Sequence, residues 1–264
     1  MLTELLYDPV QGAWIFFRVE LDGFQQSQLI ECWFTPETQI ASGYGIGKTI
    51  VSWIFLNLSC ILIPDTHCMA VYQNLQSGIN QFWKYYRQSP FMMTPLFRSQ
   101  MGELDDEGDP TKKKTAREVS ALKAFFKNGS LIILPASDMM NDGSGRMGED
   151  INRLVMDEHN ESCEKSYEAV TLSYPSRVRR AVFNSNHPVW CNKIVRSSAA
   201  KTGEHPAYPI HRKIEHHVNE GSPKWGLKQF SYKNFSSKKC HTGKTFRQQY
   251  RDDDKIASMS QNLS

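Results

Sequence analysis

The sequence lacks the features that mark secreted, zinc-binding and membrane proteins. None of its six cysteines forms a C-x-x-C pair, which argues against a disulfide framework or a zinc site and favours a reducing compartment. The first residues lack the basic segment of a signal peptide. The apolar run at residues 50–63 is interrupted by Asn57 and Ser59, so it is too short and too polar to span a bilayer. We therefore expect no membrane segment and interpret this run as a core helix.

The sequence also lacks a strong charge of either sign. Its formal net charge is +3 over 264 residues, which is too small to indicate nucleic-acid binding from charge alone. The hydrophobic content of 40% and the charged content of 22% suit a globular protein with an ample core. This length permits one large α/β domain or two small ones.

Residues 42–49 read Ser-Gly-Tyr-Gly-Ile-Gly-Lys-Thr and predict a phosphate-binding loop. A possible short strand at residues 38–41 precedes them and an apolar helical segment at residues 50–56 follows, which is the context that this motif requires. Glycines let successive backbone N–H groups point at phosphate oxygens, and the helix N-terminus adds its positive dipole end. Lys48 can reach the β- and γ-phosphates, and Thr49 can offer its hydroxyl to Mg²⁺. The candidate nucleotide-binding residues of the loop are Ser42, Gly43, Tyr44, Gly45, Ile46, Gly47, Lys48 and Thr49.

One position of this loop departs from the consensus, because Ser42 stands where the motif has glycine. The alternative interpretation is a glycine-rich turn between a strand and a helix, with no nucleotide. The loop alone does not decide between the two, so a second site is needed.

Residues 153–158 supply that second site. They form a short apolar run that ends in Asp157 and Glu158, and a buried strand of this kind places both acids at the carboxyl edge of a parallel sheet, where ligands bind. Asp157 can hold Mg²⁺ through water, and Glu158 can polarise a water for attack on the γ-phosphate. The alternative is a strand followed by a helix whose first turn carries acids that the helix dipole favours. Together with the glycine loop, the pattern favours an enzyme that hydrolyses nucleoside triphosphates.

Two further segments keep two interpretations each. Gln25 or Gln26 could read the adenine edge while Phe24 packs near the base, or these residues could belong to an amphipathic helix that packs on the sheet. A strand expected around Val182 is followed by polar residues that could sense the γ-phosphate or could form a turn closed by a proline. These polar residues are Asn184, Ser185 and Asn186.

Three other segments carry weaker signals. Residues 119–134 predict a β-hairpin with Asn128 and Gly129 in its turn, both at positive φ. Residues 102–117, first acidic and then basic, predict a surface loop, with DNA contact as the alternative. From Arg196 onward the chain is polar and basic with scattered aromatics such as Trp225, which suits either nucleic-acid binding or a small subdomain packed on the core.

The order and spacing of these motifs resemble the ATPase domain of the large terminase subunit of tailed bacteriophages, along most of the chain. That family packages viral DNA into procapsids, and its glycine loops often deviate at the first position, as Ser42 does here. Many members also place an arginine inside the loop, where this chain has Gly43 and Tyr44. The resemblance implies an adenine motif at Phe24 and Gln25 and a hairpin at residues 126–132. It implies catalytic roles for Lys48, Glu158 and a trans-acting Arg146, and metal binding by Thr49 and Asp157. It also implies a coupling motif at Asn184, Ser185 and Asn186.

The same resemblance implies an α/β fold, a P-loop NTPase of the ASCE/RecA-like type with a parallel central sheet flanked by helices. We expect strands around Ile40, Val71, Ile133, Val155 and Val182, the last of them between the loop strand and the acidic strand. We expect the ATPase core at residues 1–200, and a lid and linker at residues 201–264 that precede a nuclease domain absent from this chain. No DNA cleavage is therefore expected.

The implied activity is hydrolysis of ATP with Mg²⁺ to move DNA. The implied partners are double-stranded DNA, contacted through its backbone, the portal and procapsid, the small terminase subunit, and further copies of the chain in a ring on the portal. The implied location is the host cytoplasm. The rival interpretations are a helicase, which usually needs a second RecA-like domain, a DNA-binding module with a degenerate nucleotide site, and a nucleotide kinase.

Overall fold

The computed structural model describes a seven-stranded sheet and helices around it. The described residues are 2–42, 46–72, 76, 78–80, 85, 94–101, 122–134, 151–157, 187–198 and 208–230. In chain order they form α1 (Leu2–Leu5), α2 (Pro9–Phe17), α3 (Gly23–Phe34), β1 (Glu37–Ser42), α4 (Lys48–Leu62), β2 (His67–Val71), α6 (Pro95–Gln100), β3 (Leu122–Phe125), β4 (Leu131–Leu134), β5 (Arg153–Asp157), β6 (Lys193–Ser198), α9 (Tyr208–Asn219) and β7 (Trp225–Phe230).

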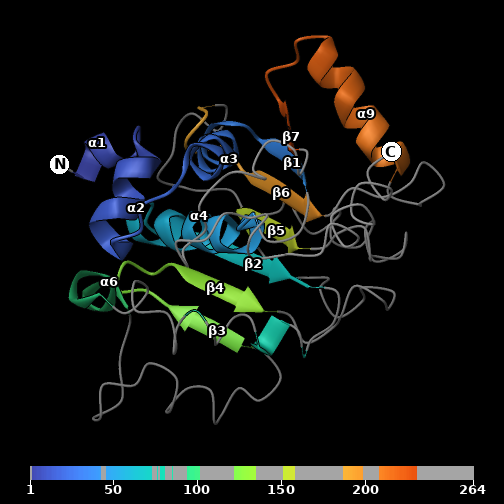
Figure 1. Cartoon of the computed structure of the whole chain (residues 1–264). Helices are drawn as coiled ribbons and strands as arrows, with labels where there is room; N and C mark the ends of the chain where they lie inside the picture. Colours follow the sequence, from blue (N-terminus) through green and yellow to red (C-terminus); the bar gives the residue numbers. More distant parts are fainter. Residues whose placement is uncertain are drawn as a thin grey trace, which may run out of the picture.

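The strands form one seven-stranded sheet in the order β3-β4-β2-β5-β6-β1-β7 (Figure 1). Every neighbouring pair is parallel except the hairpin of β3 and β4, which is antiparallel. Helices α3 and α4 contact each other and the sheet, while α9 contacts β7. The expected α/β fold with a mainly parallel central sheet flanked by helices is therefore confirmed.

Helix α4 is the centre of the core. Of its residues, all but Thr49 and Ile50 are buried, and a helix that is apolar on all sides belongs inside a protein. The polar interruption at Asn57 is satisfied within the helix, because its Nδ2 donates to the Trp53 carbonyl at 2.8 Å. The interpretation of the apolar run as a core helix is thus confirmed. No helix in the described part of the chain is long and apolar enough to cross a membrane.

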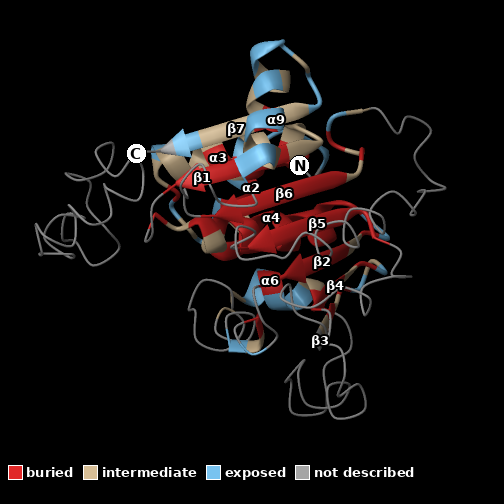
Figure 2. Cartoon of the chain, turned by 90° about the vertical axis from the view of Figure 1, so that its right-hand side faces the viewer, coloured by how far each residue is buried: buried red, intermediate tan, exposed pale blue. Residues whose placement is uncertain are grey.

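The two central strands, β5 and β6, are buried along their whole length (Figure 2). Alternate side chains of a strand face opposite sides of a sheet. Val155 and Val195 belong to the apolar cluster that contains α4, whereas Met156 and Ile194 belong to a separate cluster. Asp157, two residues after Val155, therefore lies on the side of the sheet that α4 covers.

The strand expected around Val182 lies outside the described residues, and another strand holds the position that we expected for it. β6 lies between β1 and β5 and pairs in parallel with both, so the placement of a strand ending at Asn184 between them is wrong. The apolar centre of β6 is only Ile194 and Val195, flanked by Lys193 and Arg196. Because these two residues are charged, the sequence pattern did not predict a strand here. The structure makes the charges tolerable, because Arg196 Nη2 lies 3.0 Å from Glu37 Oε2 on β1, and Lys193 Nζ donates to the Pro188 carbonyl.

β7 extends the sheet beyond residue 200. It pairs in parallel with β1, and Lys228 Nζ lies 3.1 Å from Glu31 Oε2 on α3. A Cβ atom at Gly226 would stand 2.2 Å from Glu31 Oε1, so the glycine leaves room for this carboxylate. The boundary expected at residue 200 remains a prediction, but the sheet of the core includes residues from both sides of it.

Helix α9 packs on β1 and β7, on the face of the sheet opposite to the one that α4 covers. His211 Nδ1 lies 3.3 Å from Gln39 Oε1 on β1, and Gln229 Nε2 lies 2.9 Å from His211 Nε2. The ring of Trp225 stacks on His217, with centroids 5.1 Å apart. Trp225 therefore packs on α9, within the basic and aromatic C-terminal region, and the choice between nucleic-acid binding and a small subdomain remains a prediction.

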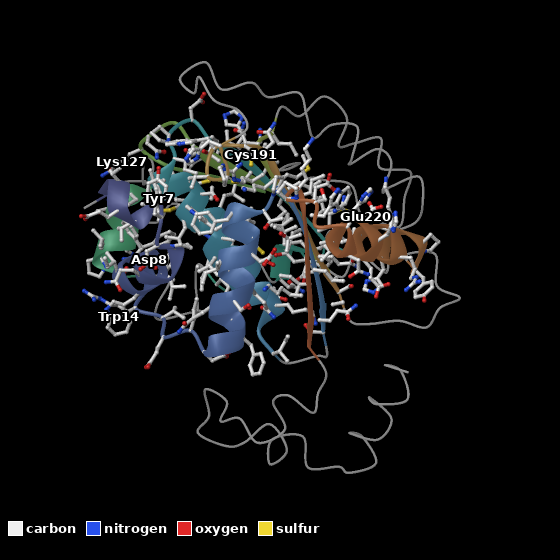
Figure 3. The ribbon with its side chains drawn as sticks, turned by 90° about the horizontal axis from the view of Figure 1, so that it is seen from above. Tyr7, Asp8, Trp14, Lys127, Cys191 and Glu220 are labelled. Atoms are coloured by element: carbon white, nitrogen blue, oxygen red, sulfur yellow. The ribbon has the colours of Figure 1, made fainter. Side chains whose placement is uncertain are left out.

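The N-terminal helices lie at the opposite end of the molecule from α9. Figure 3 shows Tyr7, Asp8 and Trp14 on one side and Glu220, just after α9, on the other. Asp8 caps α2 by accepting a hydrogen bond from the Gln11 N–H at 2.9 Å, as aspartates at helix N-termini do.

The predicted hairpin is confirmed, but its turn differs from the one that we expected. Gly129 has a φ of 85°, whereas the only described residues other than glycine with positive φ are Arg18 and Asp65, so Asn128 is not in the left-handed region. The Asn128 side chain instead caps the C-terminus of α4. Its Nδ2 donates to the carbonyls of Cys60 at 2.7 Å and Ile61 at 3.2 Å, in the last turn of α4. The hairpin turn therefore satisfies carbonyls that a helix C-terminus leaves without partners.

Removing this cap should destabilise the protein. In Asn128→Ala, the two carbonyls at the end of α4 lose their donor, and we expect the free energy of unfolding to fall by about 1–2 kcal/mol. Urea denaturation followed by circular dichroism measures this change. Lys127→Ala removes an exposed side chain from the same turn and should change the free energy by less than about 0.5 kcal/mol. Equal effects of the two substitutions would contradict the capping role.

Candidate nucleotide-binding site

The described part of the glycine loop lies between the carboxyl end of β1 and the start of α4. It consists of Ser42 and residues 46–49, while Gly43, Tyr44 and Gly45 lie outside the described residues. Gly47 is the N-cap of α4 and has a φ of 88°, with no side-chain hydrogen bond capping the helix. A glycine adopts this left-handed conformation at low cost. The first amides of α4 are therefore presented from a turn whose shape needs glycine.

Lys48 lies at the centre of this turn. Its side chain is only 5% exposed, and its Nζ donates to the carbonyl of Ser42 at 2.9 Å. The ammonium group is thus held against the end of β1, within the loop that residues 42–49 form. A buried ammonium group beside main-chain N–H donors is an arrangement that favours an anionic ligand.

Thr49 joins the loop to the acidic strand. Its Oγ1 donates to Asp157 Oδ2 at 2.9 Å, across 108 positions of sequence. Asp157 is the last residue of β5 and is 3% exposed. The structure therefore brings together the two residues that the sequence predicted as metal ligands.

The described residues of the site fit a magnesium ion that a bound nucleotide helps to coordinate. They do not form a site in which protein side chains alone coordinate a metal. A hydroxyl and a carboxylate oxygen are hard ligands, and Mg²⁺ in nucleotide sites commonly takes one or two carboxylates and completes its shell with phosphate and water. No group of three or more His, Cys, Asp or Glu side chains that could hold a metal occurs among the described residues. Thr49 and Asp157 would thus hold the ion together with a bound nucleotide.

The strand β6 adds two residues that the sequence did not reveal. Ser197 is the register partner of Asp157 on one side and of Ile40 on the other, and Ser198 is the partner of Ala41. Both hydroxyls are buried, and neither has a hydrogen-bond partner among the described residues. A buried hydroxyl of this kind costs about 1–3 kcal/mol unless a ligand or water satisfies it. The available sequence signal was a Ser-Ser pair directly after a short apolar run.

Tyr85 is a second neighbour of the acidic strand that the sequence did not reveal. Its ring packs on Trp53 of α4, with centroids 5.8 Å apart. Burial raises the pKa of Tyr85 to about 12, and the charge of Asp157 adds to this effect. A phenol is neutral at physiological pH even without this shift, so Tyr85 offers an uncharged O–H group.

The start of α3 contacts the loop. Gln25 Nε2 donates to the carbonyl of Ile46 at 3.3 Å, and Phe24, one residue earlier, is half-buried. Gln26 Nε2 donates instead to the Leu21 carbonyl at 2.7 Å. Of the two glutamines that could serve the site, only Gln25 has a hydrogen bond to the described part of the loop.

Five predicted site residues outside the loop fall in parts of the chain that the structure does not describe. They are Arg146, Glu158, Asn184, Ser185 and Asn186. Glu158 directly follows Asp157 in the chain, and its role remains a prediction, as does that of Arg146. The coupling role of the other three also remains a prediction, although β6, and not a strand ending at Asn184, lies between β1 and β5.

No protein-family model and no curated protein matches this sequence. Solved structures that are similar to it include two phage terminases and a helicase. The ATPase domain of the large terminase of Thermus phage P74-26 is 10% identical, with a TM-score of 0.45, over 82% of this chain and 97% of that chain. The large terminase of a thermophilic bacteriophage, in complex with ADP, is 14% identical, with a TM-score of 0.48, over 78% of this chain and 44% of that chain.

The third similar structure is the helicase domain of Hef from Pyrococcus furiosus. It is 14% identical, with a TM-score of 0.48, over 85% of this chain and 41% of that chain. The matched region thus spans less than half the length of the ADP-bound terminase and of the Hef chain. All three TM-scores lie below 0.5, so the fold and the site are assigned from the strand order and the contacts of this chain.

Proposed function

We propose that this chain is the ATPase motor domain of a viral terminase large subunit, which hydrolyses ATP to drive double-stranded DNA into procapsids. The observation that carries the proposal is the 2.9 Å hydrogen bond from Thr49 to Asp157. It joins a Gly-Lys-Thr turn at a helix N-terminus to a carboxylate at the end of a buried strand of the same sheet. This is the arrangement that P-loop NTPases use to bind a nucleotide with its metal.

Each residue of the site has a role in this reaction. The main-chain N–H groups at the start of α4 and the Lys48 ammonium group bind the β- and γ-phosphates, so Lys48 exchanges the Ser42 carbonyl for phosphate oxygen. Thr49 and Asp157 hold Mg²⁺, which supplies positive charge to the phosphates when bound. Glu158, the residue after Asp157, orients the attacking water and accepts its proton.

The end of β6 is a further candidate for coupling, beside the predicted coupling motif at Asn184, Ser185 and Asn186. Ser197 and Ser198 lie between the ends of β1 and β5, the strands that carry the loop and Asp157. Their buried hydroxyls have hydrogen-bonding capacity to spare. Ser197 lies on the same face of the sheet as its register partner Asp157, so a change in the phosphates would act on Ser197, and β6 would transmit it into the sheet.

The motor is proposed to act as an assembly. Arg146 of one subunit stabilises the transferred phosphoryl group at the site of its neighbour, a contribution worth about 10³–10⁵ in rate in related systems. The assembly is a ring on the portal of the procapsid, with the small terminase subunit as a further partner. DNA is contacted through its phosphate backbone and not through its bases. An isolated monomer would then hydrolyse ATP slowly.

The deciding experiment is ATP hydrolysis measured across protein concentration, with and without double-stranded DNA. We expect the activity per molecule to rise with concentration and with double-stranded DNA, because both promote the assembly. Activity that responds only to single-stranded nucleic acid would indicate a helicase. Turnover that requires a nucleoside acceptor would indicate a kinase, and no hydrolysis under any condition would leave a binding module.

The catalytic role of Glu158 has its own test. Glu158→Gln keeps the size of the side chain but removes the base, so we expect turnover to fall by about 10²-fold or more while ATP binding persists. Titration with a fluorescent ATP analogue measures binding, and phosphate release measures turnover. Retained turnover in this variant would remove Glu158 as the catalytic base.

The metal role of Thr49 is tested by Thr49→Val, which keeps the branched shape and removes the hydroxyl. We expect ATP affinity in the presence of Mg²⁺ to fall about tenfold, toward its value without Mg²⁺, because one ligand of the ion is lost. Isothermal titration calorimetry with and without Mg²⁺ measures both affinities. Thr35→Val is the matched control, since the Thr35 hydroxyl bonds Glu31 and not Asp157. An unchanged Mg²⁺ dependence in Thr49→Val would contradict the assignment.

A further inference from the structure

Both polar atoms of the Gln25 side chain have partners in the protein. Oε1 accepts a hydrogen bond from the Asp22 N–H at 3.2 Å, and Nε2 donates to the Ile46 carbonyl at 3.3 Å. A main-chain N–H can only donate and a carbonyl can only accept, so these partners fix which end of the amide is which. Reading an adenine edge uses the same two atoms, one as donor and one as acceptor. The amide nitrogen still has a second N–H and the amide oxygen a second lone pair, so both present bonds can persist when a nucleotide is bound.

The bond to Ile46 acts on the turn that leads into α4. The next residue is Gly47, the N-cap of the helix, and a Cβ atom there would stand 2.4 Å from Gln25 Nε2. Gln25 thus occupies the space beside the glycine and holds the carbonyl in front of it. Lys48 and Thr49 follow at once. A side chain that fixes this carbonyl also fixes the direction in which the first amides of α4 point.

The other end of Gln25 is anchored in a rigid helix start. Asp22 Oδ1 accepts from the N–H groups of Phe24 at 2.8 Å and Gln25 at 3.0 Å. With the Gln25 bond back to Asp22, these contacts form a capping box, which satisfies the first donors of α3 reciprocally. Gln25 therefore links a fixed helix terminus to the turn that binds phosphate.

We infer that Gln25 is a positioning residue that holds Ile46 and Gly47 in place for the phosphates. The inference rests on the proposed nucleotide-binding function and deepens it. The chemical group that benefits from Gln25 is the triphosphate chain, whatever base is attached.

Two substitutions separate the two ends of the residue. Gln25→Glu keeps an oxygen that accepts from the Asp22 N–H, since glutamate serves in a capping box as glutamine does, but it has no donor for the Ile46 carbonyl. Gln25→Leu removes both bonds without adding charge. Ser27→Ala, two residues further along the same helix, is the matched control. Thermal unfolding of all three variants reports whether the fold is kept.

The first measurement is hydrogen exchange of the full-length chain without nucleotide. Val51 N–H donates to the Gly47 carbonyl at 3.1 Å, so its exchange reports how firmly the turn holds the start of α4. We expect Gln25→Glu to raise exchange at the start of α4 by about 3- to 10-fold, as for the loss of one hydrogen bond, and Ser27→Ala to leave it unchanged. Unchanged exchange in Gln25→Glu would overturn the inference. This measurement needs no hydrolysis, so it stays decisive if the proposed function fails.

The second measurement compares three ligands, ATP, GTP and inorganic tripolyphosphate, as substrates of Gln25→Leu. We expect KM for all three to rise by the same factor, about 3- to 10-fold, with the ratio of ATP to GTP unchanged. A role that was only structural would lower the melting temperature and leave KM unchanged in the folded protein, and that result would overturn the inference. A rise in KM for ATP alone would assign Gln25 to the base and also overturn it.

Discussion

The position of helix α4 is the constraint on which the rest of the structure depends. Its burial fixes it against the sheet, and its two ends are held by unrelated parts of the chain. At the C-terminal end, Asn128 donates to two carbonyls of the last turn. At the N-terminal end, Thr49 bonds Asp157, and Gly47 gives the turn its shape. A helix held at both ends presents its first amides in one direction, which electrostatic binding of phosphate requires.

The strand order brings the rest of the site to the same edge. Parallel neighbours end together, so Ser42 of β1, Asp157 of β5 and Ser198 of β6 lie along one border of the sheet. Ligands of open α/β sheets bind at this border. The loop, the acidic strand and the serine pair come from three distant parts of the chain, and only the sheet makes them neighbours.

The parts of this arrangement that could be predicted from sequence are the local ones. Glycines before Lys48, an apolar run before Asp157 and the Asn-Gly pair of the hairpin each indicate their structure within a few residues. β6 could not be predicted, because Lys193 and Arg196 make it read as polar surface. Their burial is possible only through Glu37 and the Pro188 carbonyl, which the sequence pattern does not reveal as partners. The contact of Asn128 with α4 could not be predicted, because its partners are distant in sequence. The sequence pattern attributed Asn128 to a turn that needs positive φ, and this reason is wrong.

The room that Gly226 leaves on β7 has a consequence for how the sheet is closed. The Glu31 carboxylate fills that room and lies 3.1 Å from Lys228, with both side chains about a quarter exposed to solvent. Interactions between partly exposed charges are screened by dissolved salt, whereas the buried centre of β5 and β6 is shielded from it. The ion pair therefore attaches the edge strand β7 more tightly at low ionic strength than at high ionic strength. Salt is expected to weaken the edge of the sheet before it affects the buried centre.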